Sequence, residues 1–122
     1  MSIKTVENMI DWVELNLINN PTLDKMSEHV GYSSYYCSAK FHEVVGISFK
    51  EYVIRRKLAL AATDLKETDS RIIDIAIKYG FSSNEAFSRA FYKYYGYSPR
   101  QFRQMLPKCI EYDKSDVLVA TS

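Results

Sequence analysis

Apolar side chains recur at helical spacing through most of this chain. The opening segment has a period near 3.6, which predicts an amphipathic helix that ends at Asn19-Asn20-Pro21. Its apolar positions are Ile3, Val6, Ile10, Val13 and Leu17. The chain therefore begins with a helix that packs one face against a core.

The same periodicity predicts two shorter helices on either side of a glycine turn. Thr22 can cap the first, over residues 23–30, and Gly31 can adopt the positive φ that a tight turn requires. The second helix follows over residues 34–45. Two helices joined by a turn of three or four residues that contains glycine have the spacing of a helix-turn-helix. The sequence predicts one over residues 22–45.

Residues 48–66 contain no proline and no glycine and are rich in good helix formers, which predicts one long helix. At 100° per residue its apolar positions form two stripes. One stripe contains Phe49, Val53 and Leu60, and the other contains Ile54, Leu58, Ala61 and Leu65. A helix with two apolar stripes can serve two cores.

The chain repeats itself at an offset of about fifty residues. Gly31-Tyr32-Ser33-Ser34 returns as Gly80-Phe81-Ser82-Ser83, with one residue gained just after the second serine pair. Further matches pair Phe41 with Phe91, Gly46 with Gly96, Ser48 with Ser98, Lys50 with Arg100 and Tyr52 with Phe102. The second copy therefore predicts helices over 71–79 and 83–95, which form a second helix-turn-helix over 71–95.

Ser98-Pro99 favours a last short helix to about residue 105, because serine is a good N-cap and proline is preferred in a first helical turn. We expect a domain over residues 1–106 and a tail over 107–122 after Pro107. The tail contains the apolar Val117-Leu118-Val119. It can hold a strand, or link to a C-terminal ligand-binding domain.

Composition excludes several classes of protein. A chain of 122 residues fits one domain, or two very small ones that share a core. Cys37 and Cys109 lie far apart without metal-ligand spacing, so the sequence predicts no disulfide, no metal site and no cofactor. There is neither an apolar run of roughly 18 to 20 residues nor a signal-peptide pattern. We therefore expect a soluble, cytoplasmic protein.

The net charge of +1 conceals a segregated distribution. Residues 1–30 carry two bases and five acids, whereas residues 31–60 carry five bases and two acids. Residues 91–110 carry four bases and no acid. Because the positive stretches follow the glycine turns, a basic face can exist on a nearly neutral molecule.

The second helix of each helix-turn-helix carries the candidate DNA-reading residues, because its first turns meet base edges in the major groove. In the helix over 83–95, the periodicity assigns Phe87, Phe91 and Tyr94 to the core. The outward candidates are Asn84, Glu85, Ser88 and Arg89. Arg89 can bond to guanine O6 and N7, Asn84 can pair with adenine, and Glu85 can accept from a cytosine amino group.

The helix over 34–45 carries side chains that are weaker candidates for base contacts. Its predicted core positions are Cys37, Phe41 and Val44. Its outward candidates are Tyr35, Ser38 and Ala39. Tyr35 can stack or touch a thymine methyl, Ser38 can bond to almost any base edge, and Ala39 offers only a methyl group.

Phosphate contacts are expected at the starts of these helices and from nearby cations. Either Ser33 or Ser34 can cap the helix over 34–45, and capped N-termini bind phosphate through backbone N–H groups. The expected contacts are Ser34, Lys40, Ser83, Lys93 and Arg100. Taken singly, such residues are typical of a solvated helix surface, and the doubled motif is what favours binding to DNA.

The 19-residue helix between the motifs spans roughly 28 Å, near the roughly 34 Å between successive major-groove faces.

A longer set of residues resembles the signature of the AraC/XylS family of bacterial transcription regulators. The matching positions are Arg56-Lys57-Leu58, Ala61, Leu65, Ile73, Ile75-Ala76, Gly80-Phe81, Phe87-Ser88-Arg89, Phe91, Gly96-Tyr97-Ser98-Pro99 and Phe102-Arg103. The resemblance covers residues 5 to 105 approximately. It implies an all-α domain of seven helices, in which a long helix joins two helix-turn-helix units.

The resemblance also implies a function and partners. Members of this family bind successive major grooves on one face of double-stranded DNA, and they activate transcription by contacting RNA polymerase. The absence of an N-terminal sensor domain makes the chain similar to the stand-alone MarA/SoxS/Rob branch, whose DNA-binding unit acts as a monomer. Several relatives carry long basic or amide side chains where Ser38 and Ala39 stand. We therefore expect the second unit to supply more of the sequence preference, on an asymmetric site.

Two other classes of function compare less well with the sequence. A helical adaptor that binds protein, with weakened DNA reading, is the alternative that the low net charge and Ala39 favour. An enzyme is not expected, because the sequence contains no nucleophile-base pair, carboxylate dyad, metal-ligand set or phosphate-binding glycine loop.

Overall fold

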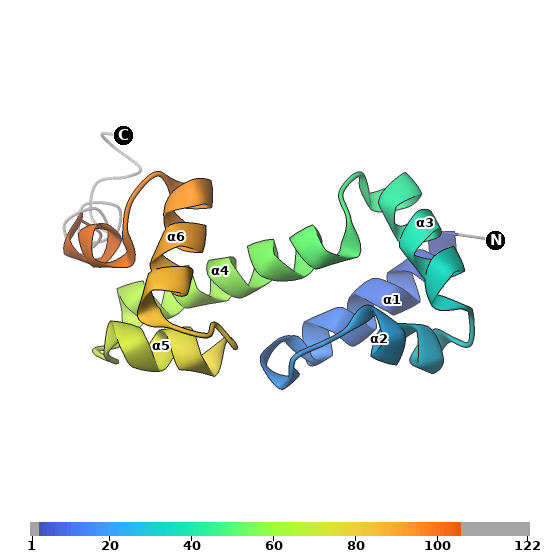
Figure 1. Cartoon of the computed structure of the whole chain (residues 1–122), viewed down its shortest axis with the longest axis horizontal. Coiled ribbons are helices and arrows are strands. Elements are labelled where there is room, and N and C mark those ends of the chain that lie inside the picture. The colour runs from blue at the N-terminus through green and yellow to red at the C-terminus, as the bar shows by residue number, and fades with distance from the viewer. Residues whose placement is uncertain (1–2, 106–122) are drawn as a thin grey trace, which may run out of the picture. The chain divides into compact units, whose positions relative to one another are not determined.

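Every regular element within residues 3–105, the part of the chain described by this computed structural model, is helical (Figure 1). The first elements are α1 (Ile3–Leu15), the 3-10 turn η1 (Leu17–Asn19), α2 (Leu23–Val30) and α3 (Ser34–Val45). The others are α4 (Phe49–Glu67), α5 (Ile72–Lys78), α6 (Asn84–Tyr95) and a last helix over residues 99–105. The prediction of an all-α fold is confirmed. The predicted tail over 107–122, with Cys109, lies outside the described residues.

The chain divides into two compact units, and the division falls inside α4, between Ala59 and Leu60. The first unit contains α1, α2, α3 and the first part of α4, and the second contains the remainder. The buried positions of α4 are Phe49, Val53, Leu58, Ala61 and Leu65. The two predicted stripes therefore hold in large part, although Ile54 and Leu60 are only half-buried.

The core of the first unit forms where α1, α2 and α3 pack on one another. Its fully buried side chains include Val6, Met9, Val13, Met26, Cys37 and Phe41. Two positions of the predicted α1 stripe were wrong, because Ile3 is 65% exposed and Ile10 only half-buried, whereas Met9 is fully buried. In α3, Val44 is exposed rather than buried, because it lies in the last turn, beyond the packed face.

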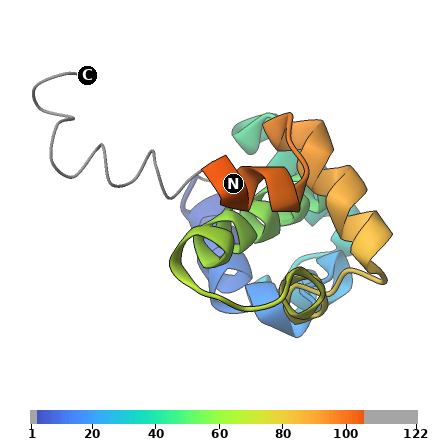
Figure 2. The same cartoon turned by 90° about the vertical axis from the view of Figure 1, so that its left-hand side faces the viewer.

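Phe41 joins α3 to α4. Its ring meets Phe49 edge-on at 5.7 Å between centroids and Tyr52 at 5.5 Å. The second unit repeats the second of these contacts, because Phe91 of α6 meets Phe102 of the helix over residues 99–105 at 5.1 Å between ring centroids. Figure 2 shows these two helices, α6 in orange and the helix over 99–105 in red-orange. The repeat in the sequence is thus a repeat of packing, in which each recognition-type helix is held to the helix that follows it.

The ends of these helices are also repeated. Gly46 and Gly96 end α3 and α6 with φ values of 95° and 78°, in the left-handed region that favours glycine. Ser48 and Ser98 then accept hydrogen bonds from backbone N–H groups three residues later, at 3.1 and 3.2 Å. Glycine and serine therefore fix the turn that follows each of the two helices.

The extra residue of the second copy lies in the turn rather than after the serine pair. Ser33 caps α3 by accepting from the Tyr36 N–H at 3.1 Å, and Ser83 caps α6 by accepting from the Ala86 N–H at 3.0 Å. The two N-caps are fifty residues apart, whereas the preceding glycines are forty-nine apart. Ser33 is therefore the cap of α3, and the register from the cap onward pairs Ala39 with Arg89.

A carboxylate bonded to a tyrosine and a cation stabilises each unit. In the first, Glu14 of α1 accepts from Tyr52 at 2.8 Å and from both Nε and Nη2 of Arg56, at 2.8 and 2.9 Å. In the second, Asp64 of α4 accepts from Tyr79 at 2.8 Å and from Lys78 at 3.0 Å. Glu14 thus links α1 to α4, and Asp64 links α4 to the end of α5.

The bonds to Arg56, more than that to Tyr52, hold the pKa of Glu14 below its ordinary value. A lowered carboxyl pKa contributes stability that is present above the unfolded pKa and is lost as the pH falls through the folded one. Burial, and then the bond to Glu14, raise the pKa of Tyr52 to about 12. The protonated Tyr52 therefore contributes stability below the ordinary pKa of tyrosine, near 10, and this contribution is lost as the pH rises from there through the raised pKa of about 12.

Ser27 is a buried polar residue without a partner for its side chain. It is 3% exposed, and its hydroxyl has no hydrogen bond within residues 3–105. Its carbonyl accepts from the N–H groups of both Gly31 and Tyr32, which close the turn after α2. Ala76 stands at the equivalent position and accepts from the Phe81 N–H. The same turn therefore forms with a buried hydroxyl in the first unit, at Ser27, and without one in the second, at Ala76.

We predict that Ser27→Ala will leave stability unchanged or raise it by up to about 1 kcal/mol, because it removes an unsatisfied buried group. The reciprocal Ala76→Ser should lower stability by about 1 to 3 kcal/mol, because it buries a hydroxyl at a fully buried site. Urea unfolding of both variants measures these changes. A loss of more than 1 kcal/mol in Ser27→Ala would show that the hydroxyl is satisfied.

We predict that Glu14→Gln will lower stability at pH 7 by at most about 1 kcal/mol, since both partners of its ion pair are roughly a third exposed. The difference from the unmodified chain should shrink toward pH 3, as protonation of Glu14 removes the same charge. Unfolding in urea at both pH values measures it. Glu51→Gln is the control, since it breaks an exposed pair within one helix, and its effect should be smaller.

Candidate nucleic-acid interface

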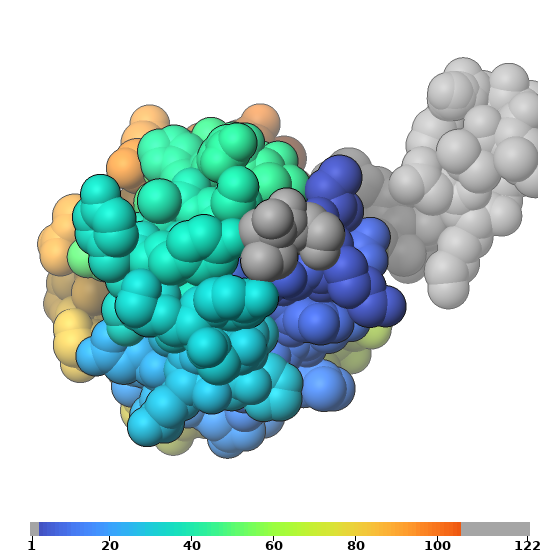
Figure 3. Space-filling view, turned by 90° about the vertical axis from the view of Figure 1, so that its right-hand side faces the viewer, coloured from blue at the N-terminus to red at the C-terminus, as the bar shows by residue number. Residues whose placement is uncertain are grey.

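The outer face of α3 is exposed in the first unit. Tyr35 is 86% exposed, and Ser38 and Ala39 are also exposed, while Cys37 and Phe41 on the other side are fully buried. Figure 3 looks onto this unit, where the turquoise α3 forms part of the surface. The predicted division of the helix therefore holds for these five positions, and the outward side chains are short apart from Tyr35.

The outer face of α6 carries longer polar groups. Asn84, Glu85 and Arg89 are exposed, Ser88 is half-buried, and Phe87 and Phe91 are fully buried on the opposite side. The predicted core residue Tyr94 is half-buried. Arg89 makes no ion pair within the described residues, so its guanidinium can bond to a ligand without losing another partner. The helix gathers an amide, a carboxylate and a guanidinium within its first two turns.

Serine caps leave the first N–H groups of α3 and α6 for an anion, because a side-chain cap satisfies only one of the orphan donors. Ser83 has this role in α6. Ser34 does not cap α3: its hydroxyl instead donates to Asp24 of α2 at 2.6 Å. Sequence reasoning missed this contact, because nothing in the spacing of ten residues signals it. A carboxylate therefore lies beside the start of α3.

The predicted phosphate-binding cations differ in their surroundings. Lys40 forms an ion pair with Glu43 at 3.1 Å, so part of its charge is already compensated. Lys93 lies over the Tyr94 ring, with Nζ 5.4 Å from its centroid. Arg100 is exposed at the start of the helix over 99–105. The cations near α6 are thus less engaged with acids than Lys40 is.

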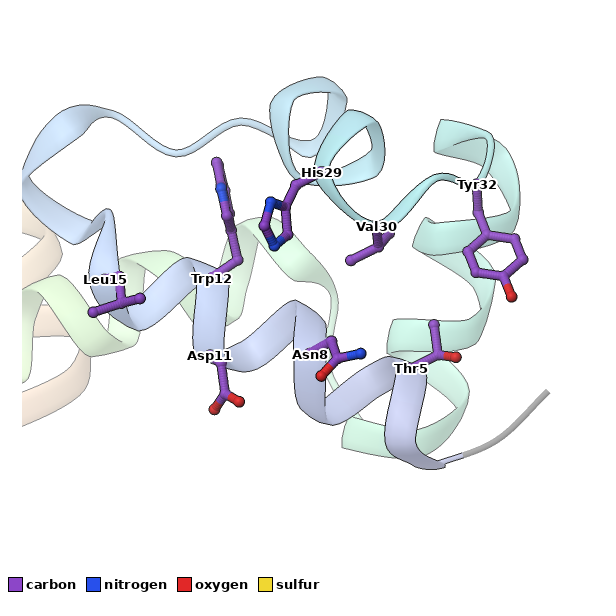
Figure 4. Close-up of a pocket in the computed structure, with 8 residues that line it drawn as sticks. All are labelled: Thr5, Asn8, Asp11, Trp12, Leu15, His29, Val30 and Tyr32. Atoms are coloured by element: carbon purple, nitrogen blue, oxygen red, sulfur yellow. The ribbon is translucent and has the colours of Figure 1, made fainter.

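A groove of about 400 Å³ lies between α1 and α2 in the first unit (Figure 4). Trp12 and His29 face one another across it with ring centroids 6.2 Å apart, and Asp11 is on its α1 side. Within the described residues, no three His, Cys, Asp or Glu side chains cluster as they would around a metal ion. His29 is therefore an aromatic lining residue of this groove.

No helix within residues 3–105 is both long and apolar enough to cross a membrane. Cys37, the one cysteine in that part of the chain, is a buried free thiol. It packs in the core of the first unit beneath the outer face of α3. The Cys37 thiol is therefore not part of the exposed face of α3.

Comparison with known proteins identifies the family. Residues 26–105 match the family described as "Helix-turn-helix domain". The HTH-type transcriptional activator AarP of Providencia stuartii is 37% identical over 98 residues, which are 80% of this chain and 73% of AarP. The multiple antibiotic resistance protein MarA of Escherichia coli (strain K12) is 34% identical over 99 residues, which are 81% of this chain and 78% of MarA.

Solved structures agree on the fold. An AraC-type transcriptional regulator from Chromobacterium violaceum has a TM-score of 0.79 and 24% identity, over 83% of this chain and 90% of its own. AarP and the Chromobacterium violaceum protein are named as regulators of transcription, which agrees with the prediction from the sequence that this chain is not an enzyme. The chain belongs to the AraC-type helix-turn-helix family of DNA-binding transcription regulators.

Proposed function

We propose that one chain binds two successive major grooves of an asymmetric promoter site, with α3 and α6 as the recognition helices, and activates transcription by contacting RNA polymerase. The observation that carries the proposal is the exposed face of α6, where Arg89 lies with Asn84 and Glu85 and has no competing ion pair within residues 3–105. A guanidinium can read guanine O6 and N7 bidentately, so we assign Arg89 the main base contact.

The two recognition helices contribute unequally in this proposal. Ala39 of α3 occupies the position equivalent to Arg89 of α6, and a methyl group cannot donate a hydrogen bond to a base. Ser38 and Ser88 are equivalent and identical. Tyr35, which is 86% exposed, is left as the largest reading group of the first unit. We therefore assign most of the sequence preference to the second unit.

Phosphate contacts position both helices on the duplex. We assign them to the N–H groups at the start of each helix, at Ser34 and Ser83, and to Lys40, Lys93 and Arg100. Because Lys40 is paired with Glu43 and Asp24 lies beside Ser34, we expect weaker phosphate binding in the first unit. The second unit then supplies more of both the affinity and the specificity.

The doubled motif supports the proposal that the chain binds as a monomer, since one chain already contains both reading helices. Activation is supported by the relative AarP, which is named a transcriptional activator. Contact with RNA polymerase is what such activation requires. Transcription in vitro with purified polymerase and a promoter selected from a random duplex pool tests it. Protein that binds the selected site without raising transcript levels would contradict the activator role.

We predict that Arg89→Ala will cost about 1 to 3 kcal/mol at one base pair of the best site and will relax the preference there. Ala39→Arg is the matched variant, and it should add a base preference in the other half-site. Competition between the selected and scrambled duplexes measures both changes. If Arg89→Ala weakened binding to the two duplexes equally, Arg89 would be a phosphate contact.

We predict that Lys93→Gln will weaken binding to all duplexes alike and reduce the salt slope, the change of log affinity with log salt, by about 1. Lys25→Gln is the control, because Lys25 is exposed on α2, outside the proposed interface. Titrations at several salt concentrations measure the slope.

The same titrations separate DNA binding from the adaptor alternative. Neutralisation of phosphates makes affinity fall steeply with salt, whereas a protein adaptor would bind no duplex even at low salt.

A further inference from the structure

A mainly apolar pocket of about 350 Å³ lies between the start of α2 and the first turns of α4. It belongs wholly to the first unit and is separate from the outer face of α3 and from the groove of Trp12 and His29. Its lining residues are Asn20, Pro21, Thr22, Leu23, Phe49, Lys50, Val53, Ile54 and Lys57. Its size is at the lower end of small-molecule sites, which span roughly 300 to 1,000 Å³.

The lining combines apolar side chains with two cations. Phe49 and Val53 are 7% and 6% exposed, and Leu23 and Ile54 are half-buried. Lys50 and Lys57 supply positive charge, and no aspartate or glutamate lines the pocket. An apolar surface under an uncompensated positive charge is complementary to a small anion that carries a hydrocarbon part.

Lys57 distinguishes this pocket from an ordinary surface depression. It is half-buried, and burial lowers the pKa of its ammonium group. The neighbouring Arg55 and Arg56 bond to Glu51 and Glu14, whereas Lys57 has no hydrogen-bond or ion-pair partner within residues 3–105. A cation held partly out of water without a counter-charge gains from an anionic ligand.

We infer that this pocket binds a small amphipathic monocarboxylate, whose carboxylate pairs with Lys57 and whose hydrocarbon part lies on Phe49 and Val53. A bare phosphate, free or in a DNA backbone, matches the lysines but leaves the apolar lining uncovered. Phe49 connects this pocket to the core beneath α3, because its ring meets the ring of Phe41 edge-on at 5.7 Å between centroids.

Calorimetric titration of the full chain with four probes tests the charge and the apolar part separately. Octanoate should bind saturably. Octanol lacks the charge and should bind about tenfold more weakly, and octylammonium and inorganic phosphate should not bind. Equal binding of octanoate and octylammonium, or no binding of octanoate, overturns the proposal. Phosphate binding as tight as that of octanoate replaces it with a simple phosphate site.

A pair of variants locates the site. Lys57→Met keeps an apolar stem and removes the charge, so octanoate affinity should fall about tenfold. Lys25→Met removes an exposed lysine of α2 that does not line the pocket, and it should leave the affinity unchanged. Equal loss in both variants, or none in Lys57→Met, overturns the assignment to this pocket. Circular dichroism checks that both variants fold, and the four probes on the unaltered chain decide the ligand class without either variant.

Discussion

Burial of one phenylalanine in each unit is the constraint on which the rest of this protein depends. Phe41 and Phe91 are fully inaccessible to solvent, and each meets an aromatic ring of the following helix edge-on. With the ring fixed, one side of the recognition-type helix must face inward and the opposite side must face water. The exposure of Tyr35 and Arg89 is therefore a consequence of packing, and the chemistry of that outer side can vary without cost to the core.

Much of the fold could be predicted because it is encoded locally. Helical periodicity located most helices within a residue or two, and glycine at a positive φ marked the turns, as at Gly31. The end of the first helix was wrong, because α1 ends at Leu15 and the 3-10 turn Leu17–Asn19 follows it before Asn20-Pro21. The errors came from packing, which a one-dimensional pattern does not contain. Met9 is buried in place of Ile3 because α2 and α3 approach α1 from one particular side. The cap of α3 was ambiguous because two adjacent serines have the same propensity.

The candidate site could be predicted only in part. The outer faces of α3 and α6 follow from the helical period once Phe41 and Phe91 are recognised as core. The bond from Ser34 to Asp24 could not be foreseen, because it joins two helices across a turn and leaves no trace in spacing. The pocket beside Lys57 was also hidden, since its lining comes from two segments nearly thirty residues apart. Contacts between elements are decided by three-dimensional packing, which the composition of each element does not reveal.

The division between the two units falls inside one helix, and this has a consequence for how the protein folds and can be cut. Phe49 and Val53 complete the interior of one unit, while Ala61 and Leu65 complete the other. A cut between Ala59 and Leu60 would interrupt the hydrogen bonds of α4 and would leave each half with only part of this helix. Melting of this helix would remove support from both interiors at once. Because α4 contributes to both interiors, we expect the two units to unfold together in one cooperative step.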